Sequence, residues 1–216
     1  MFTGIIEAIG SVVAIESRSG DKRLRINTAK MDLGNTGIGE SIAVNGVCLT
    51  VIDLPGDGFW ADVSPETLSL TTIDHWRANT PVNLEKALTP STPLGGHIVS
   101  GHIDGIARFV DQRTDGRCYR LTFSVPSHLA KYIAKKGSIT IDGVSLTVNS
   151  VDKCQFDVNI VPHTWDNTVI ARYRPGDQVN IEVDLLARYV ERLLDREPLP
   201  SSLTKSFLQE HGFAQK

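Results

Sequence analysis

Short runs in which apolar and polar residues alternate recur along the chain, and this is the pattern of half-buried β-strands. Within the first half these runs lie at roughly 3–16, 22–28, 59–63 and 81–86. Asn45-Gly46 stands between two further apolar runs and is the strongest short-range signal for a two-residue type I′ hairpin. About six short strands in about 100 residues favour a small closed barrel, because closure leaves no exposed sheet edge.

The second half of the chain repeats the first. Displaced by 97 residues, the sequence matches itself without a gap over most of its length. The matching segments are 4–7 with 101–104, 41–51 with 138–148, 65–67 with 162–164, and 82–85 with 179–182. Asp142-Gly143 thereby repeats the hairpin signal. We expect an all-β protein of two similar domains, at about 1–95 and 96–190, followed by a C-terminal segment at 185–216.

That C-terminal segment changes from alternation to helical spacing. Between about 185 and 196 the apolar positions are Leu186, Val190, Leu193 and Leu194, opposite Arg188, Glu191 and Arg192. Pro198 and Pro200 would end this helix, and a second would follow with Ser201 or Ser202 as its cap, Leu203, Phe207 and Leu208 as its apolar face, and Gly212 at its end. Such a stripe either packs on its own domain or contacts another subunit. Segments 30–36 and 127–134 predict a short helix or turn between strands.

The composition excludes several classes of protein. A formal net charge of −3 and a pI near 6.1 leave no clustered basic surface for DNA or RNA. No window reaches the roughly 18 apolar residues of a membrane-spanning helix, and the N-terminus lacks the basic leader of a signal peptide. Three widely spaced cysteines, Cys48, Cys118 and Cys154, are typical of reduced thiols. We expect a cytoplasmic protein with no nucleic-acid or membrane partner.

Three histidines, His97, His102 and His163, invite a metal site. His97 and His102 differ by an odd number, so on a strand they would point to opposite faces, and no carboxylate stands at ligand spacing. We therefore expect no metal. His102 follows a glycine and stands two residues before Asp104, and it is either a hydrogen-bonded turn histidine or an acid–base group.

Cys48 and Ser145 occupy equivalent positions in the two repeats, and each opens a Leu-Thr-Val segment after the hairpin. A single Cys or Ser on a strand is ordinarily a packing residue. Recurrence of the pair, each beside a threonine (Thr50 and Thr147), instead indicates two matching pockets. No Ser-His-Asp spacing or GxSxG segment supports a hydrolase.

Two further positions carry alternatives. Thr67 and Thr164 are equivalent, follow Pro-Glu and Pro-His, and are helix N-caps, ligand contacts or both. Lys136 stands just before the second hairpin. It is either a solvated loop residue or a charge that supports an anionic heterocycle.

As a set, these motifs resemble the riboflavin synthase family, the alpha-type enzymes built from two lumazine-binding repeats. The matching segments are 1–5, 45–51, 65–67, 95–97, 100–102, 136–137, 142–148 and 162–164, and the resemblance covers about 1–195. It implies two six-stranded Greek-key barrels and a C-terminal helix through which three identical subunits associate. Each active site would lie between the N-terminal barrel of one subunit and the C-terminal barrel of another.

The resemblance implies a dismutation that uses no cofactor. One molecule of 6,7-dimethyl-8-ribityllumazine gives a four-carbon unit to a second, which yields riboflavin and 5-amino-6-(D-ribitylamino)uracil. The C7 methyl group of this lumazine is acidic, because its carbanion is delocalised into the ring, so neither a redox group nor a metal is required. Holding two rings in contact can supply on the order of 7–11 kcal/mol, and proton transfer a further factor of about 10²–10⁴. The sequence leaves open whether lumazine synthase, which would form the substrate, associates with the chain.

Carried over by position, the resemblance assigns substrate contacts to two pockets. The first would use Gly4, Ile5, Ile6, Cys48, Leu49, Thr50, Asp62, Val63, Ser64, Pro65, Glu66 and Thr67, with Phe2 as a further contact. The second would use Gly101, His102, Ile103, Lys136, Ser145, Leu146, Thr147, Asn159, Ile160, Val161, Pro162, His163 and Thr164. His102 would carry protons, and Ser145 or Cys48 would activate or add at C7 of the acceptor. Thr147 would be a further catalytic group beside Ser145, and Lys136 would favour the anionic lumazine.

Two other functions compete with this one. A non-catalytic antenna protein of the same fold would bind one lumazine or flavin and stay monomeric. Such relatives tend to lose the symmetric polar pairs, which this chain retains. An oligonucleotide-binding barrel needs a basic face with stacking aromatic residues, whereas 6% of the residues here are aromatic and the net charge is negative. The sequence favours the enzyme.

Overall fold

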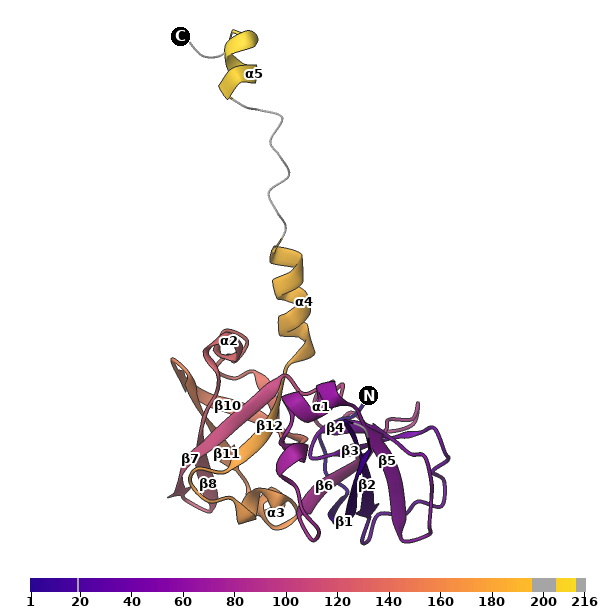
Figure 1. Cartoon of the computed structure of the whole chain (residues 1–216). Coiled ribbons are helices and arrows are strands. Elements are labelled where there is room, and N and C mark those ends of the chain that lie inside the picture. Colours follow the sequence, from indigo (N-terminus) through magenta and orange to yellow (C-terminus); the bar gives the residue numbers. More distant parts are fainter. Residues whose placement is uncertain (19, 196–204, 213–216) are drawn as a thin grey trace. The chain divides into compact units, whose positions relative to one another are not determined.

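The computed structural model describes residues 1–18, 20–195 and 205–212. Its contacts divide the chain into a compact unit, Met1–Leu185, and a second unit, Leu186–Lys216. The first unit holds two six-stranded sheets that lie side by side (Figure 1). These two sheets are the structural counterpart of the repeated sequence.

Each repeat contributes six strands. The first sheet comprises β1 (Ala8–Arg18), β2 (Asp21–Asn27), β3 (Ser41–Val44), β4 (Val47–Thr50), β5 (Gly58–Val63) and β6 (Pro81–Lys86). The second comprises β7 (Gly105–Asp115), β8 (Cys118–Ser124), β9 (Ser138–Ile141), β10 (Val144–Asp152), β11 (Gln155–Ile160) and β12 (Gln178–Val183). Short helices lie between the strands. α1 (Pro65–Leu70) and η1 (Thr72–His75) come between β5 and β6, α2 (Ser127–Ala130) between β8 and β9, and α3 (Pro162–Asp166) and η2 (Val169–Arg172) between β11 and β12.

The strands have the same neighbours in both sheets. The order β4-β3-β6-β1-β2-β5 corresponds, strand for strand, to β10-β9-β12-β7-β8-β11. Continuous pairing of β10 with β11 closes the second sheet into a barrel. In the first, a single bridge between Asp53 and Trp60 joins the chain beyond β4 to β5. The predicted all-β fold of two six-stranded Greek-key units is confirmed, and we call them the first and the second barrel.

Both predicted hairpin turns are present. Asn45 and Gly46 have φ angles of 45° and 79°, and Asp142 and Gly143 have φ angles of 44° and 80°. A type I′ turn needs φ above zero at both central residues, which Asn, Asp and Gly tolerate best. The turns join β3 to β4 and β9 to β10, so they place Cys48 and Ser145 at the same point of each barrel.

Alternation along the strands gives each barrel its own apolar core. Leu24, Phe59 and Leu84 are fully buried in the first. Phe109 and Phe123 are buried in the second, with their ring centroids 5.4 Å apart. Burying one such side chain stabilises the fold by about 1.5–3 kcal/mol. Two separate cores explain why each repeat reads as a complete barrel pattern.

The segments that precede the barrels cross from one to the other. Phe2 and Val99 form an antiparallel bridge, with N···O distances of 2.7 and 3.1 Å. Ile6 packs against the core of the second barrel, whereas Ile103 belongs to the core of the first. The predicted strand at 3–16 therefore begins late, at Ala8, because the residues before it contact the opposite barrel.

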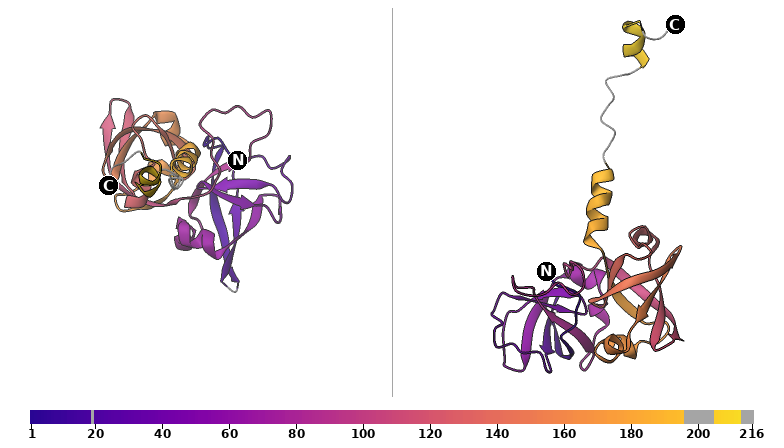
Figure 2. Two further views of the ribbon diagram at one scale, coloured as in Figure 1. Left: turned by 90° about the horizontal axis from the view of Figure 1, so that it is seen from above. Right: turned by 180° about the vertical axis from the view of Figure 1, so that it is seen from behind.

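Equivalent side chains also join the barrels in a reciprocal network. Asn83 donates from Nδ2 to the carbonyl of Asp142, and Asn180 donates to the carbonyl of Asn45, both at 2.9 Å. The side-chain oxygens of both asparagines accept N–H groups from η1 or η2 of the opposite barrel at 2.8 Å. Such reciprocity is that of a two-fold contact, and Figure 2 shows the two barrels from above and from behind. Because so many contacts join the two barrels, the predicted domain boundary at residue 95 stays a prediction.

The smaller elements differ in part from expectation. Segment 30–36 forms turns, and α2 covers only the first part of 127–134 before a turn. The second unit contains most of α4 (Leu185–Leu194) and α5 (Lys205–Glu210), as the helical spacing predicts. The predicted caps Ser201 and Ser202, with Pro198, Pro200 and Leu203, lie outside the described residues. Within the described ranges, no helix combines the length and apolar composition that a membrane span requires.

Candidate active site

Two buried glutamates hold the crossing segments. Glu85, on β6, accepts the backbone N–H and the hydroxyl of Thr3 on Oε1, both at 2.6 Å, and the N–H of Gly4 on Oε2 at 3.0 Å. Glu182, on β12, holds Ser100 and Gly101 in the same way, at 2.7, 2.6 and 2.9 Å. Burial raises the pKa of both carboxyl groups, and these hydrogen bonds oppose the rise. We call the two arrangements the glutamate clamps.

Each clamp presents a glycine carbonyl to the opposite barrel. Gly4 accepts the N–H of Ser145 at 2.8 Å, and Gly101 accepts the N–H of Cys48 at 2.9 Å. Both glycines have positive φ, of 77° and 81°. A Cβ on Gly4 would lie 2.5 Å from Cβ of Ser145, and one on Gly101 would lie 2.7 Å from Cβ of Cys48. Only glycine fits either position.

This crossing corrects the expected grouping of the pockets. The sequence grouped Gly4, Ile5 and Ile6 with Cys48, and Gly101, His102 and Ile103 with Ser145. In the structure the first three residues lie on the side of Ser145, and the second three on the side of Cys48. The sequence could not reveal this crossed arrangement. The two segments have the same pattern, so either one could pack on either barrel.

On the first barrel, Cys48 lies in an apolar setting. Its half-buried side chain packs against a cluster of Phe2, Ala43 and Val99. Thr50, two residues further along β4, is exposed on the same face of the strand. His102 is exposed beside this site, and its backbone N–H donates to Oγ of Ser100 at 3.3 Å.

On the second barrel, Ser145 has a polar partner. Its Oγ lies 2.7 Å from Nδ1 of His97, a half-buried residue of the segment that links the barrels. Burial lowers the pKa of the His97 imidazole, and the negative charge of Asp184 partly opposes this. A neutral imidazole can accept the Ser145 hydroxyl proton. Thr147 is exposed on the same face of β10, and the backbone N–H of Lys136 donates to the carbonyl of Val148, the next residue along, at 2.8 Å.

The loops that follow β5 and β11 are built alike. α1 begins at Pro65 with Ser64 as its N-cap, since the Ser64 hydroxyl accepts the N–H of Thr67 at 3.2 Å. α3 begins at Pro162 after Val161, which makes no side-chain cap. Thr67 and Thr164 therefore lie inside the helices, so the N-cap alternative for them is wrong. Glu66 and His163 are exposed on these helices and remain candidates for substrate contact.

Some predicted contact residues point away from any outer pocket. Leu49, Val63, Leu146 and Ile160 are core residues, between 0% and 9% exposed, and could meet a ligand only through their backbone. The residues next to Val63 and Ile160, which are Asp62 and Asn159, differ in charge. Asp62 forms an ion pair with Arg23 at 2.7 Å, whose hydrogen bond lowers the pKa of that carboxyl. Its equivalent Asn159 carries a buried side-chain oxygen without a hydrogen-bond partner among the described residues.

Sequence reasoning missed four residues of this arrangement. His97 was considered as a metal ligand and within the matching segment 95–97 but was given no role, and Glu85, Glu182 and Asp184 were not considered as site residues. The repeated Val-Asn-Leu/Ile-Glu segment carried a signal, because a glutamate kept at the same point of two strands is unusual in a half-buried pattern. His97 has no equivalent in the first repeat, so the repeat gave no signal for it.

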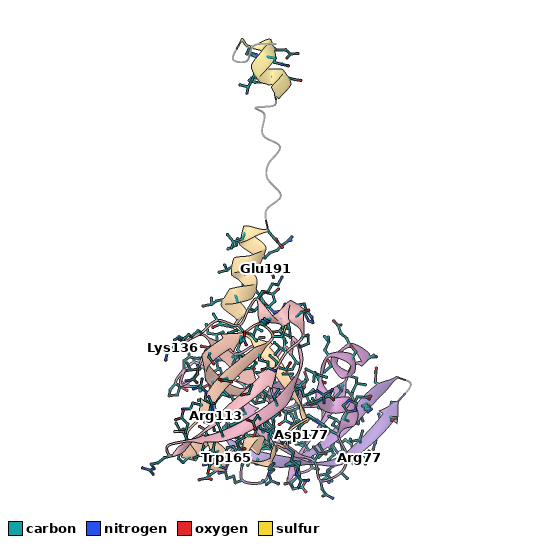
Figure 3. The ribbon with its side chains drawn as sticks, turned by 90° about the vertical axis from the view of Figure 1, so that its left-hand side faces the viewer. Arg77, Arg113, Lys136, Trp165, Asp177 and Glu191 are labelled. Atoms are coloured by element: carbon teal, nitrogen blue, oxygen red, sulfur yellow. The ribbon has the colours of Figure 1, made fainter. Side chains whose placement is uncertain are left out.

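Among the described residues, no group of three or more His, Cys, Asp or Glu could hold a metal ion. Figure 3 shows Lys136 at the outside of the second barrel.

Comparison with known proteins identifies the class to which this fold and its paired sites belong. A model of the lumazine binding domain matches residues 3–87 and 100–184, two segments displaced by the same 97 residues as the internal repeat. A solved structure of LumP complexed with riboflavin aligns with a TM-score of 0.79 at 25% identity, and the match covers 85% of this chain and 100% of that one. LumP complexed with 6,7-dimethyl-8-(1'-D-ribityl) lumazine aligns with a TM-score of 0.77 at 24% identity, covering 85% of this chain and 99% of that one.

Curated relatives narrow the class. The riboflavin synthase of Photobacterium phosphoreum is 49% identical over 216 residues, which are 99% of each chain. The riboflavin synthase of Bacillus subtilis (strain 168) is 38% identical over 218 residues, covering 99% of this chain and 100% of the relative. The chain therefore belongs to the lumazine-binding domain family, in the branch of the riboflavin synthases. The resemblance stated from the motifs is confirmed.

Proposed function

We propose that this chain is a transferase that converts two molecules of 6,7-dimethyl-8-ribityllumazine into riboflavin and 5-amino-6-(D-ribitylamino)uracil. A four-carbon unit passes from the donor to the acceptor, and the two products together contain all atoms of the two substrates. The observation that carries the proposal is a pair of equivalent sites at Cys48 and Ser145, which we call the two seats. In each seat the backbone N–H of Cys48 or Ser145 donates to a glycine of the opposite repeat, and a buried glutamate holds that glycine in place. A reaction between two copies of one compound requires two such related sites.

The residues around Ser145 would move the proton. With a lowered pKa, His97 is neutral near pH 7 and can accept a proton from the C7 methyl group directly or through the Ser145 hydroxyl, 2.7 Å away. Ser145 is also the group that would add at C7 of the acceptor. Thr147, on the same face of β10, is a further hydroxyl for the ring, and Lys136 would favour its anionic form.

The residues around Cys48 would chiefly position the other ring. Phe2, Val99 and Ala43 pack beside the thiol and exclude water from one side of it. His102 is exposed there and would carry a proton to or from bulk solvent. Orientation of two rings accounts for the larger part of such a rate enhancement, on the order of 7–11 kcal/mol.

Assembly belongs to the same proposal. α4 has an apolar stripe of Leu186, Tyr189, Val190 and Leu193, each more than half exposed. An apolar stripe of this kind is expected to pack against another surface. We propose that it joins three subunits, each with barrels at 1–95 and 96–190 and a C-terminal segment at 185–216, in the cytoplasm. Sedimentation of the purified chain tests the trimer, and added lumazine synthase in the same run tests that partner.

The reaction is tested by mixing the purified chain with dimethylribityllumazine and following riboflavin absorbance. Release of one riboflavin for every two lumazines consumed supports the enzyme. Bound lumazine that persists unchanged would instead support the non-catalytic antenna protein. Ser145→Ala and His97→Gln should each lower turnover by about 10²-fold or more while lumazine still binds. Cys118→Ser, on a half-buried thiol of β8 outside both seats, is the matched control.

A further inference from the structure

A cavity of about 350 Å³ lies between the barrels, and none of its lining residues belongs to the candidate active site. Every lining residue is matched in the lining by its equivalent 97 residues away. Among these pairs are Asn45 with Asp142, Trp76 with Tyr173, and His75 with Arg172. The cavity therefore lies on the two-fold relation of the repeats, and we call it the axial cavity. Its volume is within the range of about 300–1,000 Å³ that is usual for small-molecule sites.

The buried polar lining of the axial cavity combines a donor with an acceptor. Asn45 and Asp142 are 6% and 4% exposed, and their turns touch, since a Cβ on Gly46 would lie 2.7 Å from N of Gly143. Asn45 uses its Oδ1 to accept the N–H of Asn83 at 2.7 Å, and its amide NH₂ has no hydrogen-bond partner among the described residues. Asp142 accepts one hydrogen bond on each carboxylate oxygen, so each oxygen retains a free lone pair.

Aromatic rings and a cation border this pair. Trp76 is 7% exposed and belongs to the core of the first barrel, and half-buried Tyr173 packs on Phe109 and Phe123 in the second. Both line the cavity, and Arg172 stands exposed in the lining. Asp177, another lining residue, is labelled in Figure 3 near the place where the barrels meet. Flat aromatic walls favour a planar ring.

The repeat itself shows that the turn at Asp142 does not require an acid. Its equivalent Asn45 starts the same type I′ turn and accepts the same strand N–H through Oδ1, at 2.7 Å against 2.8 Å for Asp142. A neutral amide thus makes the same turn contact, while the second carboxylate oxygen of Asp142 accepts the Tyr173 hydroxyl at 2.6 Å. Burying an ionisable carboxyl group costs free energy unless its charge is used. A ligand that needs an acceptor at this point would use it.

We propose that the axial cavity binds a small planar lactam of the pyrimidinedione class. The Asn45 amide donates to a ring carbonyl, and the Asp142 carboxylate accepts the adjacent ring N–H. Trp76 and Tyr173 contact the faces or edges of the ring, and Arg172 contacts substituents. The cavity shares no lining residue with the proposed reaction, so either proposal can fail without the other.

Fluorine NMR of the full chain labelled with 5-fluorotryptophan tests this site. The chain has three tryptophans, Trp60, Trp76 and Trp165, and single Trp→Phe variants assign their signals. Uracil, titrated to about 10 mM as expected for so small a ligand, should shift the Trp76 signal to saturation and leave the other two in place. 1,3-Dimethyluracil, which lacks the ring N–H, should shift none of them.

Three variants sharpen the test. Asp142→Asn should weaken uracil binding about tenfold or more, because the ring N–H loses its acceptor. Gln178→Phe, at the exposed rim, should block the cavity without touching Asn45 or Asp142. Arg174→Ala, an exposed neighbour outside the lining, should leave affinity unchanged. Unmoved Trp60 and Trp165 signals report an intact fold in each variant. A Trp76 signal indifferent to uracil, or equal responses to uracil and its dimethyl form, would overturn the proposal.

Discussion

The first and second barrels share a frame but differ in the groups that can do chemistry. Three features are the same in both barrels. They are the glutamate clamps of Glu85 and Glu182, the asparagines that bond across the contact, and the glycines, Gly4 and Gly101, that lie against the two seats. Beside Ser145 lies a hydrogen-bonded His97, whereas Cys48 packs among apolar side chains. Duplication thus preserved what positions two rings and diverged in what transfers protons. The second barrel is the more reactive half of the proposed pair of sites.

The largest expected effect separates the two seats. Ser145→Ala should lower turnover by about 10²–10⁴-fold, because it removes the hydroxyl bonded to His97. Cys48→Ala should lower it by less than about tenfold, since its surroundings offer orientation and no proton path. Single-turnover rates at saturating lumazine measure both. A greater loss in Cys48→Ala than in Ser145→Ala would reverse the assignment of roles.

A second comparison concerns the two hairpin turns, in which Asn45 and Asp142 occupy equivalent positions. Burial raises the pKa of Asp142 to about 7, against an ordinary value of 3.8. Because the folded state holds this proton more tightly, the stabilising effect is complete below about pH 4 and is lost as pH rises through 7. Asp142→Asn removes this pH dependence of the unfolding free energy. The free energy of unfolding of the variant, minus that of the unmodified chain, should therefore increase by up to about 4 kcal/mol as the pH rises from about 4 to about 7. Urea unfolding at pH 4.5 and 8 measures it. A constant difference at both pH values would show that Asp142 titrates normally.

The clamps provide a third comparison. Glu182→Gln and Glu85→Gln keep the size of the side chain but lose a charged acceptor of three hydrogen bonds. Each should lower the free energy of unfolding by about 1.5–3 kcal/mol. Glu182→Gln should in addition speed alkylation of Cys48, because Gly101 is then held less firmly against it. Peptide mass mapping of alkylated Cys48 reads this out. Equal alkylation rates in the two variants would contradict the crossed arrangement.

The smallest expected effect is on the pH profile. Since burial lowers the pKa of His97, its basic form persists below the ordinary histidine range. The acidic limb of kcat/KM for lumazine should therefore lie below pH 6.5, and His97→Gln should remove that limb while His102→Gln leaves it in place. A limb that follows His102 instead would move the base to the first barrel.

The sequence predicts the frame of this molecule better than its contacts. The 97-residue offset, the two Gly-containing turns and the pairing of Cys48 with Ser145 all follow from local pattern and repetition. The crossing of residues 2–6 and 99–103 does not, because two segments of like pattern can seat on either barrel and only long-range contacts decide between them. His97 was missed as a partner of Ser145 for a related reason. It lies in the linker, where no repeat marks it and no periodicity points to its neighbour.

The central claim is that the two related sites of this protein bind two lumazine molecules that react with each other without an added cofactor. The most direct test incubates the purified chain with dimethylribityllumazine in metal-free buffer and quantifies all three compounds by chromatography. The account predicts that two lumazines disappear for each riboflavin and each 5-amino-6-(D-ribitylamino)uracil formed. Lumazine that stays bound but unchanged through a long incubation would contradict it.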